Sequence, residues 1–267
     1  MLVFHLDIRS TVVSKAKPGI ILKTANEIEI IRAGGRLLHQ CLQLVREAAV
    51  ERVRTKDLDQ LAYDFIISHG GKPTFKGYHG FPASLCVSVN EEVVHGIPNN
   101  RRLKSGDIVS VDCGFTWHGY IADSTTTIAV GIIEPKIEKL LKVTEESLYL
   151  GIAQAQAGNY VQDISRAVQE HVESHGFSVV RDLVGQGVGQ DLDEEPQVPN
   201  YVSKDRGAKL EPGMVIAIEP MINTGTYEVA TKRDGWTIVT LDKGYSAHFE
   251  HTVAITNNGP MILTNGE

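Results

Sequence analysis

The chain has 267 residues, of which 42% are hydrophobic and 22% are charged, and its formal net charge is −7. This composition excludes a disordered chain, and the acidic balance argues against nucleic-acid binding because no basic surplus is present to neutralise phosphates. No run of about 18 apolar residues occurs, so no membrane span is expected. The three cysteines are far apart and lack C-x-x-C spacing, which favours a reducing compartment and predicts a cytoplasmic protein.

Two helical segments repeat along the chain. Residues 57–70 read DLDQLAYDFIISHG and residues 163–176 read DISRAVQEHVESHG, at an offset of 106 residues. Both have the apolar spacing of an amphipathic helix, and both begin with aspartate and end at glycine. We therefore expect two helices, with Asp57 and Asp163 as N-caps and a glycine just beyond each C-terminus.

Two strand segments repeat at nearly the same offset. Residues 103–112 (LKSGDIVSVD) match residues 210–219 (LEPGMVIAIE) at an offset of 107. Each segment is a turn followed by an apolar strand that ends in a carboxylate. A site between the two repeats would therefore receive Asp112 from one and Glu219 from the other.

The duplication predicts an α+β fold made of one domain with two related halves. The domain is expected over residues 22–267, after an N-terminal extension of residues 1–21. Its halves would be roughly residues 22–130 and 131–267. Each half consists of helices followed by strands, so we expect the sheets of the two halves to face each other.

Residues 108–130 are predicted to form a β-hairpin. With the turn centred between Trp117 and His118, Asp112 and Asp123 are directly opposite on one face, about 5 Å apart. A turn one residue later makes them diagonal neighbours on the same face. Like charges at this separation leave three alternatives: a shared proton, a wrong register with both carboxylates solvated, or a bridging divalent cation. The cation is favoured, because two-ion hydrolase sites use carboxylates from several strands.

Two glutamates add to this acidic set. Glu219 ends an apolar run and precedes Pro220, whereas Glu250 lies between Phe249 and an apolar strand at residues 252–255. An acid within an apolar strand is costly to bury alone. Either glutamate by itself could be a solvated strand end, but four such carboxylates together favour a metal site.

Six motifs in combination resemble those of the type I methionine aminopeptidases, which have the pita-bread metallo-aminopeptidase fold. The resemblance extends from about Leu22 to Thr264. It implies two pseudo-symmetric halves with antiparallel sheets, covered by helices, around a central metal cleft. Related proline-specific peptidases usually carry an extra N-terminal domain, for which this chain has no room. The motifs are GYHGFPASLCVSVNEEVVHGIP (77–98), LKSGDIVSVD with ADST (103–112, 122–125), DEEPQVPNY (193–201), LEPGMVIAIEPM (210–221), KRDGWT (232–237) and SAHFEHTVAIT (246–256).

The resemblance also implies the roles of individual residues. Asp112, Asp123, Glu219 and Glu250 would bind two divalent ions such as Mn, Fe or Co, with Asp123 and Glu250 bridging them. Glu219 would also act as general base, and His95 would contact the scissile amide nitrogen. An apolar pocket would hold the methionine side chain, although its residues could also be ordinary core side chains. The pocket residues are Phe75, Tyr78, Phe81, Cys86, Leu192 and Trp236.

Two positions depart from the family pattern. The family has a G-H-G-[IV]-G loop whose histidine binds one metal ion, whereas this chain has Gln186 there. Seven residues later, Asp193 replaces a second histidine that contacts the substrate carbonyl. An amide oxygen is a poorer ligand than imidazole for transition metals, so one ion site is expected to be weakened or empty. An ionised carboxylate would repel the developing oxyanion, so catalysis is expected to be slow.

One compensation is suggested by His248, which stands where the family usually has glutamine. It lies two residues before Glu250, so the two side chains share a strand face. We consider that Asp193 orients His248 and that this imidazole does part of the work of the missing histidine. The alternative is an ordinary hydrogen-bonded strand histidine.

The sequence therefore predicts a cytoplasmic metallo-exopeptidase that removes N-terminal methionine from peptides and nascent chains, with reduced activity. We expect a monomer that associates transiently with the ribosome and binds neither membrane nor nucleic acid. The alternative is a pseudoenzyme that binds peptide N-termini or partner proteins without turnover. The four carboxylates favour the enzyme, whereas the residues at positions 186 and 193 favour the pseudoenzyme.

Overall fold

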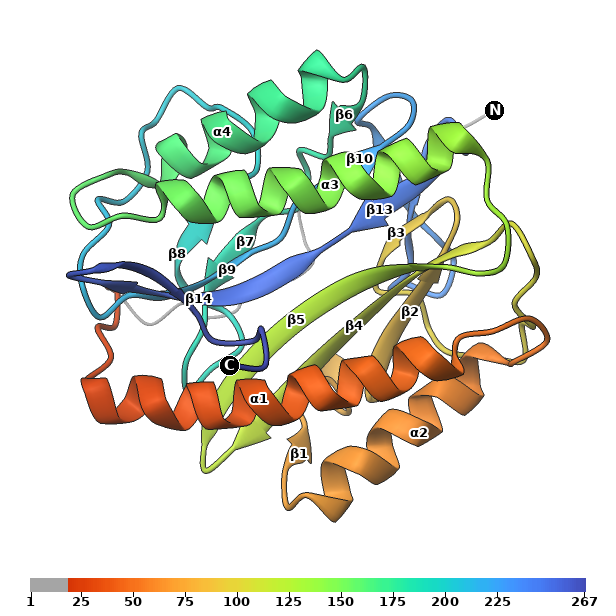
Figure 1. The fold of residues 1–267 in the computed structure, drawn as a ribbon, viewed down its shortest axis with the longest axis horizontal. Helices are drawn as coiled ribbons and strands as arrows, with labels where there is room; N and C mark the ends of the chain where they lie inside the picture. The colour runs from red at the N-terminus through yellow and green to blue at the C-terminus, as the bar shows by residue number, and fades with distance from the viewer. Residues whose placement is uncertain (1–18) are drawn as a thin grey trace, which may run out of the picture.

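The computed structural model describes residues 19–267, so most of the expected N-terminal extension lies outside the described residues. Within these described residues, two helices and a run of strands are followed by two further helices and a second run of strands (Figure 1). Within residues 19–267, no helix is long and apolar enough to cross a membrane. The helices are α1 (Ala25–Ala48), α2 (Thr55–Ser68), α3 (Pro135–Gln154) and α4 (Val161–Ser174), and a 3₁₀ turn, η1, spans Tyr78–Gly80.

The repeated helices are α2 and α4, which have equal lengths of 14 residues and begin 106 residues apart. We expected Asp57 and Asp163 to be the N-caps of these helices, but both lie at the third helical position. Each carboxylate accepts a hydrogen bond from the backbone N–H of the cap residue, which is Arg54 in α2 and Tyr160 in α4. The prediction missed this because an aspartate can satisfy the free N–H groups of the first turn from either position.

The main sheet has nine strands and runs through both halves of the chain. Its order is β1-β4-β5-β14-β9-β7-β8, with β2 also paired to β4 and β15 to β14. We expected the sheets of the two halves to face each other. Instead, they are joined edge to edge into one sheet, where β5 pairs with β14. The strands are β1 (Lys72–Pro73), β2 (Leu85–Val89), β4 (Ile108–Trp117), β5 (Tyr120–Ala129), β7 (Gly185–Gly187), β8 (Glu194–Val198), β9 (Val215–Ile218), β14 (Glu250–Thr256) and β15 (Gly259–Ile262).

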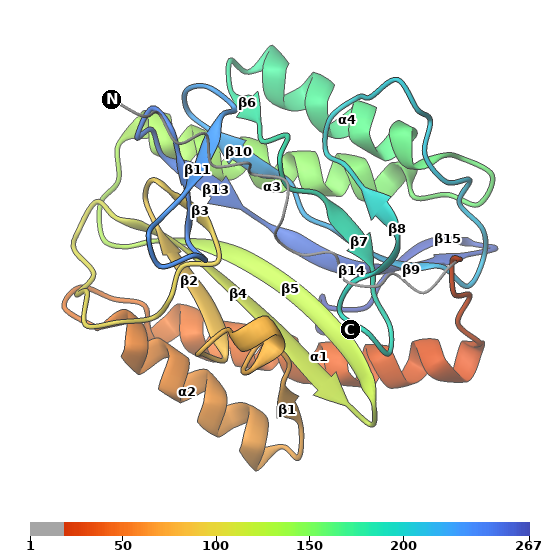
Figure 2. The same ribbon diagram turned by 180° about the vertical axis from the view of Figure 1, so that it is seen from behind.

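Two three-stranded sheets complete the fold (Figure 2). One has the order β13-β10-β6 and the other β11-β12-β3. The second sheet contains a hairpin, β11–β12, that pairs with β3. The strands are β3 (Glu92–Val94), β6 (Ser178–Val179), β10 (Met221–Asn223), β11 (Val229–Thr231), β12 (Ile238–Thr240) and β13 (Ser246–His248).

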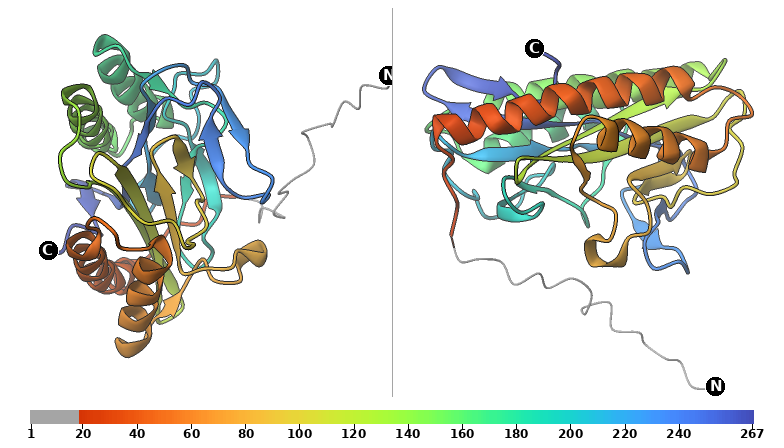
Figure 3. Two further views of the ribbon diagram at one scale, coloured as in Figure 1. Left: turned by 90° about the vertical axis from the view of Figure 1, so that its right-hand side faces the viewer. Right: turned by 90° about the horizontal axis from the view of Figure 1, so that it is seen from below.

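The four helices lie along one side of the main sheet, and the β11–β12 hairpin lies on the other (Figure 3, left). Residues 109, 111, 113 and 115 of β4 belong to the core beneath α1 and α2. Because side chains alternate along a strand, Asp112 faces away from these helices. Helix α1 can lie close to the chain end because Gly35 has no side chain; a Cβ there would be 2.0 Å from the carbonyl oxygen of Leu263.

The β4–β5 hairpin turns one residue later than the first of the two predicted registers. Trp117 pairs with Tyr120, and the central residues His118 and Gly119 have φ of 47° and 83°. Positive φ at both central positions is typical of a type I′ turn, which suits glycine at the second of them. Asp112 and Asp123 are therefore diagonal neighbours on one face, which is the second predicted register.

Candidate metal centre

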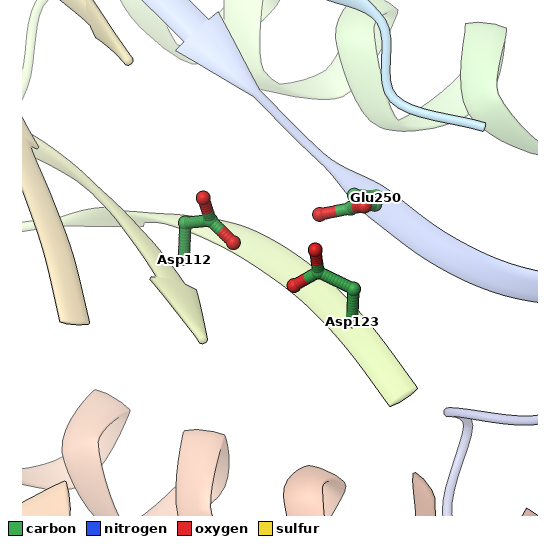
Figure 4. A group of neighbouring side chains, drawn as sticks. All are labelled: Asp112, Asp123 and Glu250. Carbon is green, nitrogen blue, oxygen red and sulfur yellow. The ribbon is translucent and has the colours of Figure 1, made fainter. Parts of the chain in front are cut away.

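Three carboxylates converge on the face of the main sheet that is turned away from the helices. Asp112 lies on β4, Asp123 on β5 and Glu250 on β14, which are adjacent strands. One oxygen from each carboxylate lies within 4.8 Å of the others (Figure 4). Asp123 is only 5% exposed and Oδ1 of Asp112 is buried, so the alternative in which both aspartates are solvated is wrong.

The electrostatics of this cluster require a positive charge or protons. Burial, together with the neighbouring carboxylates, raises the pKa of Asp123 and of Glu250 well above the ordinary range. Within residues 19–267, Oδ1 of Asp112 and Oδ1 of Asp123 are buried and have no hydrogen-bond partner. Buried carboxylate oxygens without donors are suitable ligands for a divalent cation, so this donor set fits a metal ion.

Glu219 follows β9 and lies beside the three-carboxylate group. Burial is the main cause of its raised pKa, and the charges of Asp112 and Asp193 raise it further. The nearby side-chain amide of Gln186 acts in the opposite direction and lowers the pKa of Glu219. Strand β7 can lie this close because residue 185 is glycine: a Cβ there would be 2.4 Å from the Ala217 carbonyl oxygen.

His95 and His248 lie near each other, and His248 lies beside one of these carboxylates, Glu219. His95 directly follows β3, has a left-handed φ of 57° and has a pKa lowered by burial. His248 ends β13, is 2% exposed, and has its pKa lowered to about 3 by burial and by the nearby His95. Its Nε2 atom is 3.7 Å from Oε2 of Glu219. Both rings are therefore neutral at physiological pH.

Asp193 does not orient His248 as expected. It is exposed, and its Oδ2 accepts a hydrogen bond from the Tyr78 hydroxyl. The acidic neighbour of His248 is Glu219 instead. The expectation failed because position 193 lies on the loop before β8, where its side chain reaches η1.

The six residues predicted to form an apolar pocket belong to one cluster. Trp236 packs edge-on against Phe81, with 5.2 Å between the ring centroids. Cys86 links this cluster to the carboxylates, because it is paired with Asp112 in the β2–β4 register. The predicted members of the cluster are Phe75, Tyr78, Phe81, Cys86, Leu192 and Trp236, and they are joined by Ala83, Ile97, Ile121, Val188 and Ala217.

Two supporting residues were missed. The Thr125 hydroxyl donates a 2.8 Å hydrogen bond to Oε2 of Glu250, and the Asn200 side chain donates one of 3.0 Å to the Glu219 carbonyl oxygen. Both lie within motifs that carried the family resemblance. Alternation along β5 places Thr125 on the same face as Asp123, which was the available signal.

Comparisons with known proteins agree with this geometry. The family model described as metallopeptidase family M24 matches residues 29–257. The chain belongs to metallopeptidase family M24. Within this family it is similar to the methionine aminopeptidase of Clostridium perfringens, with 51% identity over 245 residues that make up 92% of this chain and 98% of that relative.

Solved structures of the M24 family confirm the pita-bread fold. The crystal structure of methionine aminopeptidase from Thermotoga maritima matches with a TM-score of 0.90 and 44% identity, covering 92% of this chain and 99% of that chain. The prolidase from Pyrococcus horikoshii matches with a TM-score of 0.75 but only 22% identity over 64% of its length, and so shares the fold alone. This M24 chain is therefore an enzyme of the methionyl aminopeptidase type, a metallo-exopeptidase.

Proposed function

We propose that the chain removes N-terminal methionine from peptides and nascent proteins, at a rate reduced by Gln186 and Asp193. The observation that carries this proposal is the pairing of Cys86 with Asp112, which places an apolar cluster directly beside the buried carboxylates. An aminopeptidase specific for methionine needs this arrangement, because the apolar side chain and the scissile bond are only a few atoms apart.

The residues of the site divide the work between binding and proton transfer. Two divalent ions of the Mn, Fe or Co type, held by Asp112, Asp123, Glu219 and Glu250, would supply Lewis acidity and a nucleophilic water. Glu219 accepts the proton of the attacking water as general base. His95 contacts the nitrogen of the scissile amide. The pocket around Phe81 and Trp236 holds the thioether side chain and excludes water.

Gln186 and Asp193 reduce the rate for separate reasons. The Gln186 amide lies beside Glu219 but offers no imidazole nitrogen to an ion. Asp193 places a carboxylate where an oxyanion donor is needed, and loss of one such donor costs about 10²–10³ in rate. If no turnover remains, the chain is a protein that binds peptide N-termini.

The test is hydrolysis of Met-Ala-Ser by the metal-free protein reloaded with Mn²⁺, Co²⁺ or Fe²⁺, compared with Asp112→Asn. We expect slow release of methionine that Asp112→Asn abolishes. Peptides that begin with lysine serve as the specificity control, because the pocket is apolar. A rate within about tenfold of an ordinary methionine aminopeptidase would contradict the reduced activity. The absence of hydrolysis with all three ions would contradict the proposed turnover.

We also propose that the chain acts as a monomer in the cytoplasm and associates transiently with ribosomes. Its three cysteines are free and buried, which suits a reducing compartment. Sedimentation velocity tests the monomer, and cosedimentation with ribosomes that carry nascent chains tests the association. A stable dimer would contradict the first proposal. A chain that pellets to the same extent with and without ribosomes would contradict the second.

A further inference from the structure

The imidazole of His248 has an unused nitrogen inside the site. Its Nε2 atom is buried and, among the described residues, has no hydrogen-bond partner. The nearest acidic atom is Oε2 of Glu219 at 3.7 Å, which is too long for a hydrogen bond. A buried polar atom without a partner costs free energy, so a structure that retains one needs a ligand for it.

The position of His248 is fixed by its backbone. Its N–H donates to the hydroxyl oxygen of Thr127 at 2.9 Å, and that hydroxyl donates to the His248 carbonyl at 2.7 Å. Met221 of β10 pairs with His248, so strands hold it from two sides. The main chain of His248 is therefore fixed, and its side chain, which is only 2% exposed, has little room to turn towards a different partner.

The distance suits two ligands of one ion. Atoms that each bind one ion at about 2.1 Å lie less than about 4.2 Å apart, and 3.7 Å falls within this limit. We propose that His248 Nε2 is a nitrogen ligand of the ion that Glu219 binds. This inference rests on the proposed metal centre and deepens it: the nitrogen donor that Gln186 does not supply comes from His248 on β13 instead.

This assignment predicts a mixed donor set rather than an all-oxygen one. The ion at Glu219 then keeps the preference for Co²⁺, Fe²⁺ or Mn²⁺ over Mg²⁺ that a nitrogen ligand confers. The other ion would be held by Asp112, Asp123 and Glu250, without a nitrogen donor. One ion should therefore respond to substitution of His248, and the other should not.

The test uses the full chain loaded with Co²⁺, whose unpaired electrons shift the ring N–H proton of a bound histidine far outside the normal proton NMR range. We expect one such solvent-exchangeable signal in the parent and none in His248→Gln. The affinity of one of the two ions should fall at least about tenfold in His248→Gln, measured by calorimetric titration. His251→Gln is the matched control, because His251 bonds Thr264 instead of facing the carboxylates. It should keep both the signal and the affinity.

Several outcomes would overturn the inference. A parent without the shifted signal, a signal that persists in His248→Gln, or an unchanged affinity each shows that His248 is not a ligand. Circular dichroism of the ion-free variants checks folding, and His248→Asn provides a second variant if His248→Gln does not fold. Methionine release is measured separately. If the parent cleaves peptides but shows no shifted signal, the proposed function stands and this inference is wrong. If the parent shows the signal but does not cleave, the inference stands and the proposed function is wrong.

Discussion

The hydroxyl of Tyr78 donates a hydrogen bond to the carboxylate of Asp193, and this contact joins the apolar cluster around Phe81 to the loop before β8. Burial raises the pKa of Tyr78, and so does Asp193, because both disfavour the phenolate. The carboxylate is thus held at the edge of the apolar cluster. If this cluster binds the first side chain of a peptide, as we propose, the carbonyl group that follows it would lie near Asp193.

Replacing Asp193 by histidine should increase the rate of methionine release. The imidazole can donate to the oxyanion and removes a repulsive charge, so we expect kcat of Asp193→His to rise about 10²-fold. Asp191→His is the control, since it adds the same ring two residues away on the loop. Steady-state hydrolysis of Met-Ala-Ser measures both variants. An equal rise in both would show that the ring acts at a distance rather than at position 193.

The β11–β12 hairpin should control substrate affinity through Lys232. Its Nζ atom is 2.5 Å from Oε1 of Glu92, which anchors the hairpin that presents Trp236 to Phe81. Because the Lys232 side chain is 39% exposed, solvent weakens this ion pair, and we expect Lys232→Met to raise KM about twofold to fivefold with kcat nearly unchanged.

The control for this hairpin is Arg233→Met, which removes the neighbouring exposed charge. It should leave KM close to that of the parent. Lys232→Arg should restore most of the affinity because it keeps the positive charge. A fall in kcat without a change in KM would place Lys232 in the chemical step and contradict a role in positioning.

Removal of divalent ions should destabilise the fold, and more strongly at higher pH. Without ions, the raised pKa values of Asp123 and Glu250 mean that the folded state binds protons that the unfolded state has released. Stability of the ion-free protein therefore falls as the pH rises through these values. Ions at about 100 times their Kd add about 2.7 kcal/mol per site.

Calorimetry with and without EDTA at pH 5 and pH 8 measures this effect. We expect the larger decrease of Tm at pH 8, and a smaller difference between the two pH values in Asp123→Asn. An EDTA effect that is equal at both pH values, or larger at pH 5, would be inconsistent with a cluster of buried like charges.

A second pH dependence arises at the start of α1. The Tyr120 hydroxyl donates a 2.6 Å hydrogen bond to Glu27, which lowers the pKa of Glu27 to about 2 with help from Thr24. Since this folded-state pKa lies below the ordinary value, the contact stabilises the fold above about pH 4.3 and loses its effect as pH falls towards 2.

Urea unfolding of the parent and of Tyr120→Phe between pH 7 and pH 3 tests this contact. The difference in free energy of unfolding should be constant near neutral pH and shrink below about pH 4. Glu29→Gln, which changes an exposed glutamate on the same helix, should show no such trend. A difference that grows on acidification would contradict the assignment.

Local rules were sufficient to predict the core of the site. Asp112 and Asp123 share a face in either hairpin register, since both registers conserve the alternation of side chains. The exact register depended on the φ angles of His118 and Gly119, which composition alone does not determine. The aspartates of α2 and α4 correctly indicated that helices begin nearby, but the helices begin about one turn earlier than we predicted.

Contacts between distant segments could not be predicted in this way. Lys23 and Glu194 form a buried ion pair although 171 residues separate them. The proximity of His248 to Glu219 likewise depends on the pairing of β13 with β10, the strand that begins two residues after Glu219. Nothing in the spacing of these residues carries that information, because it arises only when the sheets assemble.

The continuous sheet also limits how a peptide can enter. Glu250 pairs with Thr125 and His251 with Ser124 across the junction of the two halves. Spreading the halves apart like a hinge would break this ladder and disperse the carboxylates at the same time. We therefore expect the main sheet to move as one unit. Substrate entry and product exit would then depend on the segments that border it, which are η1 with Tyr78, the loop with Asp193 and the hairpin with Trp236.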